Sequence, residues 1–364
     1  MVAGVAGPGG VFAAVVQWQA VHGRHGLPWQ GSPDPYRVWL SEIMLQQTQV
    51  STVSRYYPVF LARFPDVTAL AQADVDEVLS LWSGLGYYSR ARNLHQCAKR
   101  VVSDHAGAFP ARSDVLARLP GIGPSTAAAI AAFCFGERTS IFDGNVKRVM
   151  ARFLGFGEDL SGSAASQRLL ALTQAMVPTD AAGSDMGVYT QGLMDLGATL
   201  CTRSRPACLA CPLAEGCVAR QTGQQAVLPL KTRRVKRQTL SLYLLVARKP
   251  DGSVGLERRP AEGIWASLWC FPEFSDRSLL SRVLGVLPMP SVTDWPVVRH
   301  ALTHRELVLH PVVCEVAHNW EPPGSKNAGA WQWVAPGQPV QGGIPVPVRS
   351  LLAQLANGCP PPAL

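Results

Sequence analysis

The chain has 364 residues, more than one ordinary hydrophobic core accommodates, so we expect two domains. Its 33 basic residues against 25 acidic ones give a net charge of +8, which favours a polyanionic partner without requiring one. No stretch of 18 uncharged apolar residues occurs, which argues against a membrane-spanning helix. The nine cysteines, an odd number, are typical of a protein kept in a reducing cytoplasm.

The first segment, 1–10, is rich in glycine and alanine and lacks the charged start of a signal peptide. We expect it to be a disordered lead-in. From about 11 to 225 the pattern is typical of a helical domain. Asp34 followed by Pro35 is a good N-cap and first-turn pair, which predicts a helix over 36–52.

Glu42 lies within this predicted helix. Its helical neighbours Val38, Trp39 and Leu45 are apolar. A carboxylate in such a setting loses hydration, so its pKa rises and it can act as a general acid near neutral pH. The alternative is an ordinary glutamate at the edge of a helix face.

The segment Leu119–Pro124 separates two predicted helices. Gly121 and Gly123 allow a tight turn, and a strong helix-forming run starts at Ser125. The free backbone N–H groups at that helix start could bind a DNA phosphate, which is the helix–hairpin–helix pattern. The alternative is a plain turn between two antiparallel helices.

Asp143 follows this hairpin by about 20 residues. It is expected to cap a helix that begins near Asn145, and capping leaves a catalytic role open. Lys147 and Arg148 come next on that helix, where they could meet phosphate.

Four cysteines are spaced C-x6-C-x2-C-x5-C in one short loop: Cys201, Cys208, Cys211 and Cys217. Four thiolates on a loop suit tetrahedral zinc or an iron–sulfur cluster. The alternatives are two disulfides or unrelated buried thiols. The single C-x2-C pair favours a [4Fe–4S] cluster over zinc.

The character of the chain changes after about residue 226. A basic run within 226–238 predicts a linker, which is either a solvated segment or a DNA contact. Strand signals then alternate with turns, and they predict a smaller α+β domain over 239–358. The predicted strands are Leu240–Leu245, Val254–Arg258, Leu268–Phe271, Leu307–Val316 and Trp331–Val334, with a final helix over Val348–Leu355.

Together, the cysteine loop, the hairpin and Asp143 resemble the endonuclease III superfamily of DNA glycosylases. Three further motifs look like the MutY-type adenine DNA glycosylases: Leu27–Trp29, Ser41–Val50 and Gly84–Leu94. The resemblance runs from about residue 11 to the end of the chain. It implies a mainly α glycosylase domain over 11–225 with a [4Fe–4S] cluster on the loop 201–217. An α+β domain similar to MutT (Nudix-like) would follow and recognise the lesion.

The implied reaction is hydrolysis of the N-glycosidic bond of adenine mispaired with 8-oxoguanine or guanine in double-stranded DNA. The resemblance implies that Glu42 protonates adenine at N7 and that Asp143 stabilises the sugar cation. It also implies three groups of contact residues. They are Gln47, Tyr87, Gly121, Gly123, Ser125 and Lys147 for DNA, Trp29, Gln30 and Gln191 for adenine, and Leu302, Thr303 and His304 for 8-oxoguanine.

Two departures refine this expectation. Ser125 stands where the lyase branch carries its lysine, so we expect no Schiff base and a monofunctional enzyme. After residue 239 no R-E-x-x-E-E metal helix occurs, so we expect lesion recognition there and no nucleotide hydrolysis. The alternatives are a bifunctional pyrimidine-lesion glycosylase with lyase activity and a non-enzymatic, zinc-stabilised DNA-binding protein. We expect a monomer in the cytoplasm, associated with the nucleoid of a bacterium and not with a membrane.

Overall fold

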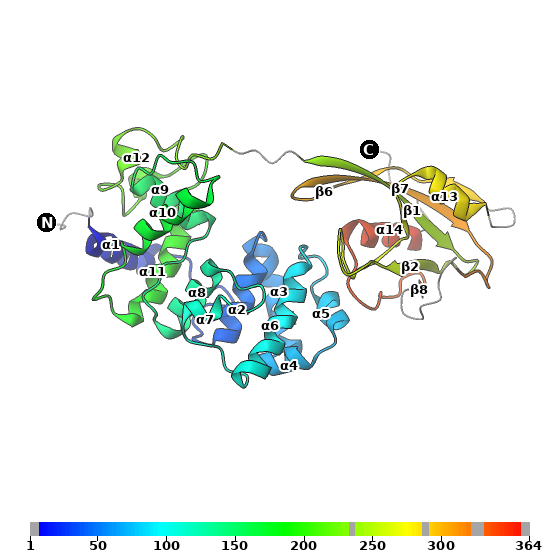
Figure 1. Cartoon of the computed structure of the whole chain (residues 1–364), viewed down its shortest axis with the longest axis horizontal. Helices are drawn as coiled ribbons and strands as arrows, with labels where there is room; N and C mark the ends of the chain where they lie inside the picture. The colour runs from blue at the N-terminus through cyan, green and yellow to red at the C-terminus, as the bar shows by residue number, and fades with distance from the viewer. Residues whose placement is uncertain (1–6, 233–236, 286–290, 322–330, 358–364) are drawn as a thin grey trace. The chain divides into compact units, whose positions relative to one another are not determined.

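The computed structural model describes residues 7–232, 237–285, 291–321 and 331–357 (Figure 1). The chain forms two compact units. The first comprises Met1–Gln72 and Asn93–Arg234, and the second comprises Ala73–Arg92 and Val235–Leu364. Most of the predicted lead-in, 1–6, lies outside the described residues, as does 233–236 of the predicted linker.

The first unit is helical. Its α-helices are α1 (Pro8–His22), α2 (Pro35–Leu45), α3 (Val50–Arg63), α4 (Val67–Gln72), most of α6 (Ser89–His105), α7 (Ser113–Leu116), α8 (Pro124–Phe135), α9 (Gly144–Phe153), α10 (Ser163–Gln174), α11 (Gly183–Asp195) and α12 (Val218–Gln221). A π-helical turn over Leu196–Leu200 continues α11, and a 3-10 turn covers Cys208–Ala210. The expectation of a disordered lead-in is wrong at its end, because α1 begins at Pro8.

The start of α2 follows the sequence prediction, but its end does not. Asp34 Oδ1 accepts a hydrogen bond from Tyr36 N at 2.9 Å, so Asp34 is the N-cap. The predicted helix over 36–52 is wrong beyond Leu45, because Gln47 has a φ of 56° and helix geometry cannot continue through it. The chain turns there and begins α3 at Val50.

Close helix packing sets the frame around the site. In α8 the run Ala127–Ala132 is buried, and its mostly small side chains allow α2 and α11 to pack against it. Gly192 has the same effect where α11 meets α1, because a Cβ atom there would lie 2.6 Å from Val15 Cγ1. The segment that follows α1 is held at the end of α11 by Arg24, which forms an ion pair with Asp195 at 2.7 Å.

The second unit is built on a mixed sheet, and within the described residues its strands run in the order β3-β2-β1-β7-β5. Strands β1 and β7 pair in parallel from Gln238–Arg305 to Arg248–Glu315, while β4 pairs with β1, β6 with β7 and β8 with β2. The elements are α5 (Val75–Leu81), β1 (Gln238–Arg248), β2 (Val254–Arg258), β3 (Trp269–Cys270), β4 (Glu273–Phe274), α13 (Arg277–Leu284), β5 (Val292–Asp294), β6 (Val298–Ala301), β7 (Arg305–Glu315), β8 (Trp331–Val334) and α14 (Val346–Ala356).

The five predicted strands and the final helix are confirmed, with small shifts at their ends, whereas β4, β5, β6 and α13 were not predicted. Leu280 and Leu284 of α13 pack on Leu245 and Val312 of the sheet.

The segment 73–92 joins the second unit, although the sequence alone placed it in the helical domain. The Tyr88 hydroxyl donates to Ile344 O at 2.5 Å, and Arg92 Nη1 donates to Ala266 O at 2.7 Å. Arg258 forms an ion pair with Asp76 at 2.7 Å. Across the described residues, none of the helices has the length and apolar character needed to cross a bilayer.

Candidate active site

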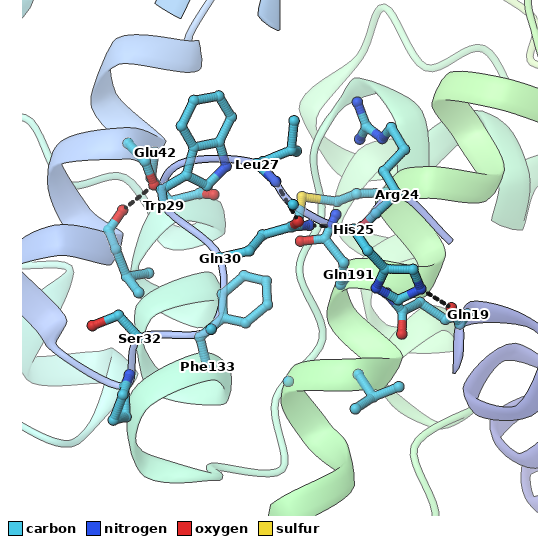
Figure 2. Close-up of a pocket in the computed structure, with 18 of the residues that line it drawn as sticks. Gln19, Arg24, His25, Leu27, Trp29, Gln30, Ser32, Glu42, Phe133 and Gln191 are labelled. Atoms are coloured by element: carbon cyan, nitrogen blue, oxygen red, sulfur yellow. Dashed lines mark hydrogen bonds between the residues drawn. The ribbon is translucent and has the colours of Figure 1, made fainter. Parts of the chain in front are cut away.

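A cavity of about 580 Å³ opens in the first unit (Figure 2). Its lining includes Glu42 from α2, Gln191 from α11, and Trp29 and Gln30 from the segment between α1 and α2. The structure therefore brings the three residues predicted for the adenine pocket to the same cavity as the predicted acid. A cavity of this size, lined by both apolar and polar side chains, suits a small ligand with polar groups.

Glu42 has a perturbed acidity in this cavity. Burial, in the first place, and the nearby charge of Asp143 raise the pKa of Glu42 from 4.5 to about 7. Val38 and Trp39, its neighbours on α2, are buried as the helical pattern predicts. Close to neutral pH, Glu42 is therefore able to hold a proton and to release it.

Asp143 is the N-cap of α9, as predicted. Its Oδ1 accepts hydrogen bonds from Asn145 N at 2.9 Å and from Val146 N at 2.8 Å. The hydroxyl of Ser125, at the start of α8, accepts from Phe142 N at 3.2 Å and so ties the hairpin to the Asp143 segment. Asp143 is not among the residues that line the cavity, and it acts on Glu42 through its charge.

The predicted hairpin connects α7 to α8. Gly121 has a φ of 75°. Gly123 is the N-cap of α8, and because glycine has no side chain, it supplies no capping hydrogen bond to the backbone N–H groups at the start of that helix. Lys147 Nζ lies 4.8 Å from the centre of the Phe142 ring. Arg148 differs from the expectation of a phosphate contact, because its guanidinium donates to Cys201 O at 2.8 Å and Gly197 O at 2.6 Å.

The four loop cysteines line one small cavity of about 30 Å³ next to α9. None of them forms a disulfide, so the disulfide alternative is wrong. Arg152, which is 3% exposed, donates to Thr202 O at 2.7 Å and lies 3.3 Å from Cys201 Sγ. Across the described residues, no group of three or more histidine, cysteine or acidic side chains is already arranged to hold a metal ion.

The predicted lesion residues lie in the second unit. Leu302, Thr303 and His304 form the turn between β6 and β7. The hydroxyl groups of Tyr87 and Thr303 are hydrogen-bonded at 3.1 Å. In the first unit, Gln47 is exposed at the turn that follows α2.

Sequence reasoning missed a buried ion pair beside the cavity, of which only Arg24 lines it. Asp195, the last residue of α11, is fully buried, and Arg24 pairs with it at 2.7 Å. These residues are 171 positions apart and belong to no spaced motif, so only the packing of α1 on α11 reveals the pair.

Comparisons with known proteins identify relatives of this chain. Residues 40–174 match the family described as "HhH-GPD superfamily base excision DNA repair protein", and residues 243–354 match the NUDIX domain family. The adenine DNA glycosylase of Buchnera aphidicola subsp. Acyrthosiphon pisum is 31% identical over 93% of this chain and 95% of its own. This chain belongs to the adenine DNA glycosylase family. The human adenine DNA glycosylase is 34% identical over 78% of this chain and 63% of its own.

As a member of that family, the protein is a DNA N-glycosylase of base excision repair, and the resemblance inferred from its motifs is confirmed. A solved thermostable thymine-DNA glycosylase has the fold of the first unit, with a TM-score of 0.52 and 24% identity over 59% of this chain and 97% of its own. The individual roles of Glu42, Asp143 and the contact residues stay predictions.

Proposed function

We propose that this adenine DNA glycosylase is monofunctional and removes adenine mispaired with 8-oxoguanine or guanine from double-stranded DNA. It acts as a monomer in the cytoplasm, at the nucleoid. The observation that carries the proposal is Glu42, whose pKa is raised to about 7 at the wall of a cavity it shares with Trp29 and Gln191. That combination suits acid catalysis on a flat heterocycle.

In the proposed reaction, adenine leaves the base stack and enters the cavity, which costs a few kcal/mol of unstacking. Glu42 gives its proton to N7 of adenine, which makes the base a better leaving group. Asp143 supports the positive charge that develops on the sugar. One of the two carboxylates then takes a proton from the incoming water, which completes hydrolysis.

We propose the absence of lyase chemistry from the side chains that line the cavity. A Schiff base requires an amine, and the residues that line the cavity include no lysine. Ser125 stands at the start of α8, and its hydroxyl accepts a hydrogen bond from Phe142 N. A hydroxyl in this position does not form an imine.

We also propose a [4Fe–4S] cluster held by Cys201, Cys208, Cys211 and Cys217. Four free cysteines line one cavity, and Arg152 and Arg148 bring positive charge to its edge, which suits an anionic cluster of thiolates. Burial raises the pKa of the Cys211 thiol to about 11, so a metal is needed to keep it deprotonated at neutral pH. The cluster would hold the loop in place.

Iron and sulfide analysis of the purified protein tests this assignment. We expect iron and sulfide in the wild type and loss of both in Cys208→Ser. Stoichiometric zinc without sulfide would show that the four cysteines hold zinc and would contradict the cluster assignment.

Recognition of the opposite base is proposed for the turn 302–304. The hydrogen bond between Tyr87 and Thr303 joins a residue predicted to contact DNA to one predicted to contact 8-oxoguanine. Thr303 retains a hydroxyl that can bond a lesion edge, and each such bond contributes roughly 0.5–1.5 kcal/mol.

Base release from duplexes that carry adenine opposite 8-oxoguanine, guanine or thymine tests the proposal. We expect free adenine from the first two duplexes and much less from the third. No covalent adduct should form with borohydride. A trapped adduct, or release of an oxidised pyrimidine and no adenine, would refute the proposed function.

A further inference from the structure

The loop 259–268, between β2 and β3, holds two residues other than glycine in the left-handed region. Trp265 has a φ of 55° and Ser267 a φ of 62°. A bulky side chain rarely adopts a positive φ, because its Cβ atom crowds the backbone. Such conformations persist only where surrounding contacts hold them, and they are found most often at functional sites.

Hydrogen bonds to the backbone hold this loop in its strained form. Arg92 Nη1 donates to Ala266 O at 2.7 Å, and Ala266 itself is buried. The backbone N of Ser267 donates to Pro260 O at 2.9 Å and closes the loop. The fold thus fixes the conformation on both sides of Trp265.

This conformation brings the indole of Trp265 to His300 on β6. The two ring centres lie 6.1 Å apart, with their planes inclined by 48°. Both residues are half-buried. Burial lowers the pKa of His300, so its ring is uncharged at neutral pH and packs as an ordinary aromatic partner.

His300 leads directly to the turn 302–304. Leu302 N donates to Arg305 O at 2.8 Å, so the pairing of β6 with β7 continues one residue beyond β6. His300 and Leu302 are half-buried, and the residues that alternate with them are exposed. Since side chains alternate along a strand, His300 and Leu302 share one face, which is the face that Trp265 contacts.

The turn is therefore held at two points. The hydroxyl of Tyr87 is hydrogen-bonded to that of Thr303 at 3.1 Å, on the exposed side of the turn. On the other face, the support comes from Trp265 through His300. Without the indole, the second support is lost and the turn is free to shift.

We propose that Trp265 is a positioning residue for recognition of the base opposite adenine. The inference rests on the proposed function, in which Thr303 bonds 8-oxoguanine. By packing on His300, the indole keeps the turn 302–304 in one position. A hydrogen bond selects its partner only when its donor is held in place, so a loose turn loses selectivity while the chemistry at Glu42 continues.

The test compares single-turnover release of adenine opposite 8-oxoguanine and opposite guanine, and the ratio of the two rate constants is the readout. Trp265→Gly removes the ring. Because glycine adopts a positive φ without strain, this change also relaxes the backbone. We expect the ratio to fall by about three- to tenfold, which is the range of a lost aromatic contact.

Two matched variants separate the ring from the loop. Trp265→Phe keeps an aromatic ring at the same place, and its ratio should stay within about twofold of the wild type. Ser267→Gly relieves the other left-handed residue and leaves the indole untouched, so its ratio should not change. Hydrogen exchange of the amides of β7 shows whether the second unit stays folded in each variant.

If Trp265→Gly loses that protection, Trp265→Leu takes its place, because leucine keeps apolar bulk and lacks the flat ring. We expect the same fall in the ratio. His300→Ala should lower the ratio to a similar level. Adding Trp265→Gly to His300→Ala should then cause no further fall, because the indole acts through the imidazole.

Three results would overturn the inference: a ratio within about twofold of the wild type in a folded variant without the ring, a Trp265→Phe ratio as low as that of Trp265→Gly, or a double variant whose loss is the product of the two single losses. Failure of the wild type to release adenine from either duplex would instead refute the proposed function, and with it this inference.

Discussion

At the scale of single residues, the protein keeps one carboxyl group in a setting that opposes its charge. Burial on α2 raises the pKa of Glu42 to about 7, and the charge of Asp143 adds to the effect. Asp143, by contrast, receives backbone hydrogen bonds at the start of α9, where the helix dipole favours a negative charge. The two environments suit an acid and an anion respectively.

This setting has a consequence for stability. Because the pKa of Glu42 is raised on folding, its protonated form favours the folded state at low pH, and ionisation costs stability as the pH rises through about 7. Glu42→Gln removes that cost. We predict that its free energy of unfolding exceeds that of the wild type by about 3 kcal/mol at pH 8 and equals it below about pH 4.5.

Urea unfolding of both proteins at several pH values measures this difference. Glu262→Gln, in an exposed loop, is the matched control and should show no such pH-dependent difference. A Glu42→Gln variant that is less stable than the wild type at pH 8 would show that the ionised carboxylate is favourably paired.

At the scale of elements, the hairpin offers two glycines with different constraints. Gly121 has a φ of 75°, and a Cβ atom there would lie 2.7 Å from Asn93 Cβ. Gly123 has a φ of −82°, and a Cβ atom would meet nothing within 4 Å. We predict that Gly121→Ala lowers the free energy of unfolding by roughly 1–3 kcal/mol, whereas Gly123→Ala changes it little.

Thermal and urea unfolding of the two variants check this prediction side by side. Equal stabilities would mean that the turn relaxes around a side chain at Gly121. The comparison also prepares DNA-binding measurements, because Gly123→Ala keeps the fold while altering the surface proposed to meet phosphate.

Much of the helical and strand pattern could be predicted from local signals. The Asp34–Pro35 pair predicted the start of α2, and Asp143 predicted the start of α9. Both residues are N-caps in the structure. Periodicity did not reveal the break at Gln47, because a left-handed residue leaves no trace in hydrophobic spacing. The short strands β4, β5 and β6 were missed because pairing with longer neighbours stabilises them more than their own sequence does.

The candidate site divides in the same way. Glu42 and the cysteines belong to dense local motifs, so the sequence could name them as candidates. Arg24 and Asp195 meet only because α1 packs on α11, and no local pattern encodes that contact. The residue spacing in the sequence also does not reveal that Arg148 donates a hydrogen bond to Cys201 O in the cysteine loop, or that Gln30 accepts one from Leu27 N.

At the scale of the whole molecule, the structure shows where the chain can be divided. Leu228 is buried, and its carbonyl accepts from Arg152 Nε at 2.9 Å. Thr232 donates hydrogen bonds to the Asp159 carboxylate from its backbone N and its hydroxyl, so the helical unit extends along the chain at least to Thr232. A cut after Thr232 therefore preserves contacts that a cut at about 227 would break.

We predict that a chain ending at Thr232 still releases adenine, because Glu42, Asp143 and the cysteine loop precede the cut. Its preference for 8-oxoguanine over guanine should shrink, since Thr303 and the Tyr87–Thr303 hydrogen bond are gone. Thr303→Ala in the full chain should weaken the preference less, by about two- to tenfold. Single-turnover rates on the two duplexes decide this. If truncation leaves their ratio unchanged, the second unit does not read the lesion.

The central claim, that Glu42 is the acid that releases adenine, is tested most directly by the pH dependence of single-turnover adenine release from an adenine:8-oxoguanine duplex, with Glu42→Gln measured beside the wild type. The account predicts a wild-type rate constant that falls about tenfold per pH unit above about 7, as the protonated form of Glu42 disappears. It predicts no measurable release by a folded Glu42→Gln protein that still binds the duplex. Release by that variant within tenfold of the wild type, or a wild-type rate constant that stays level from pH 6 to 9, would contradict it.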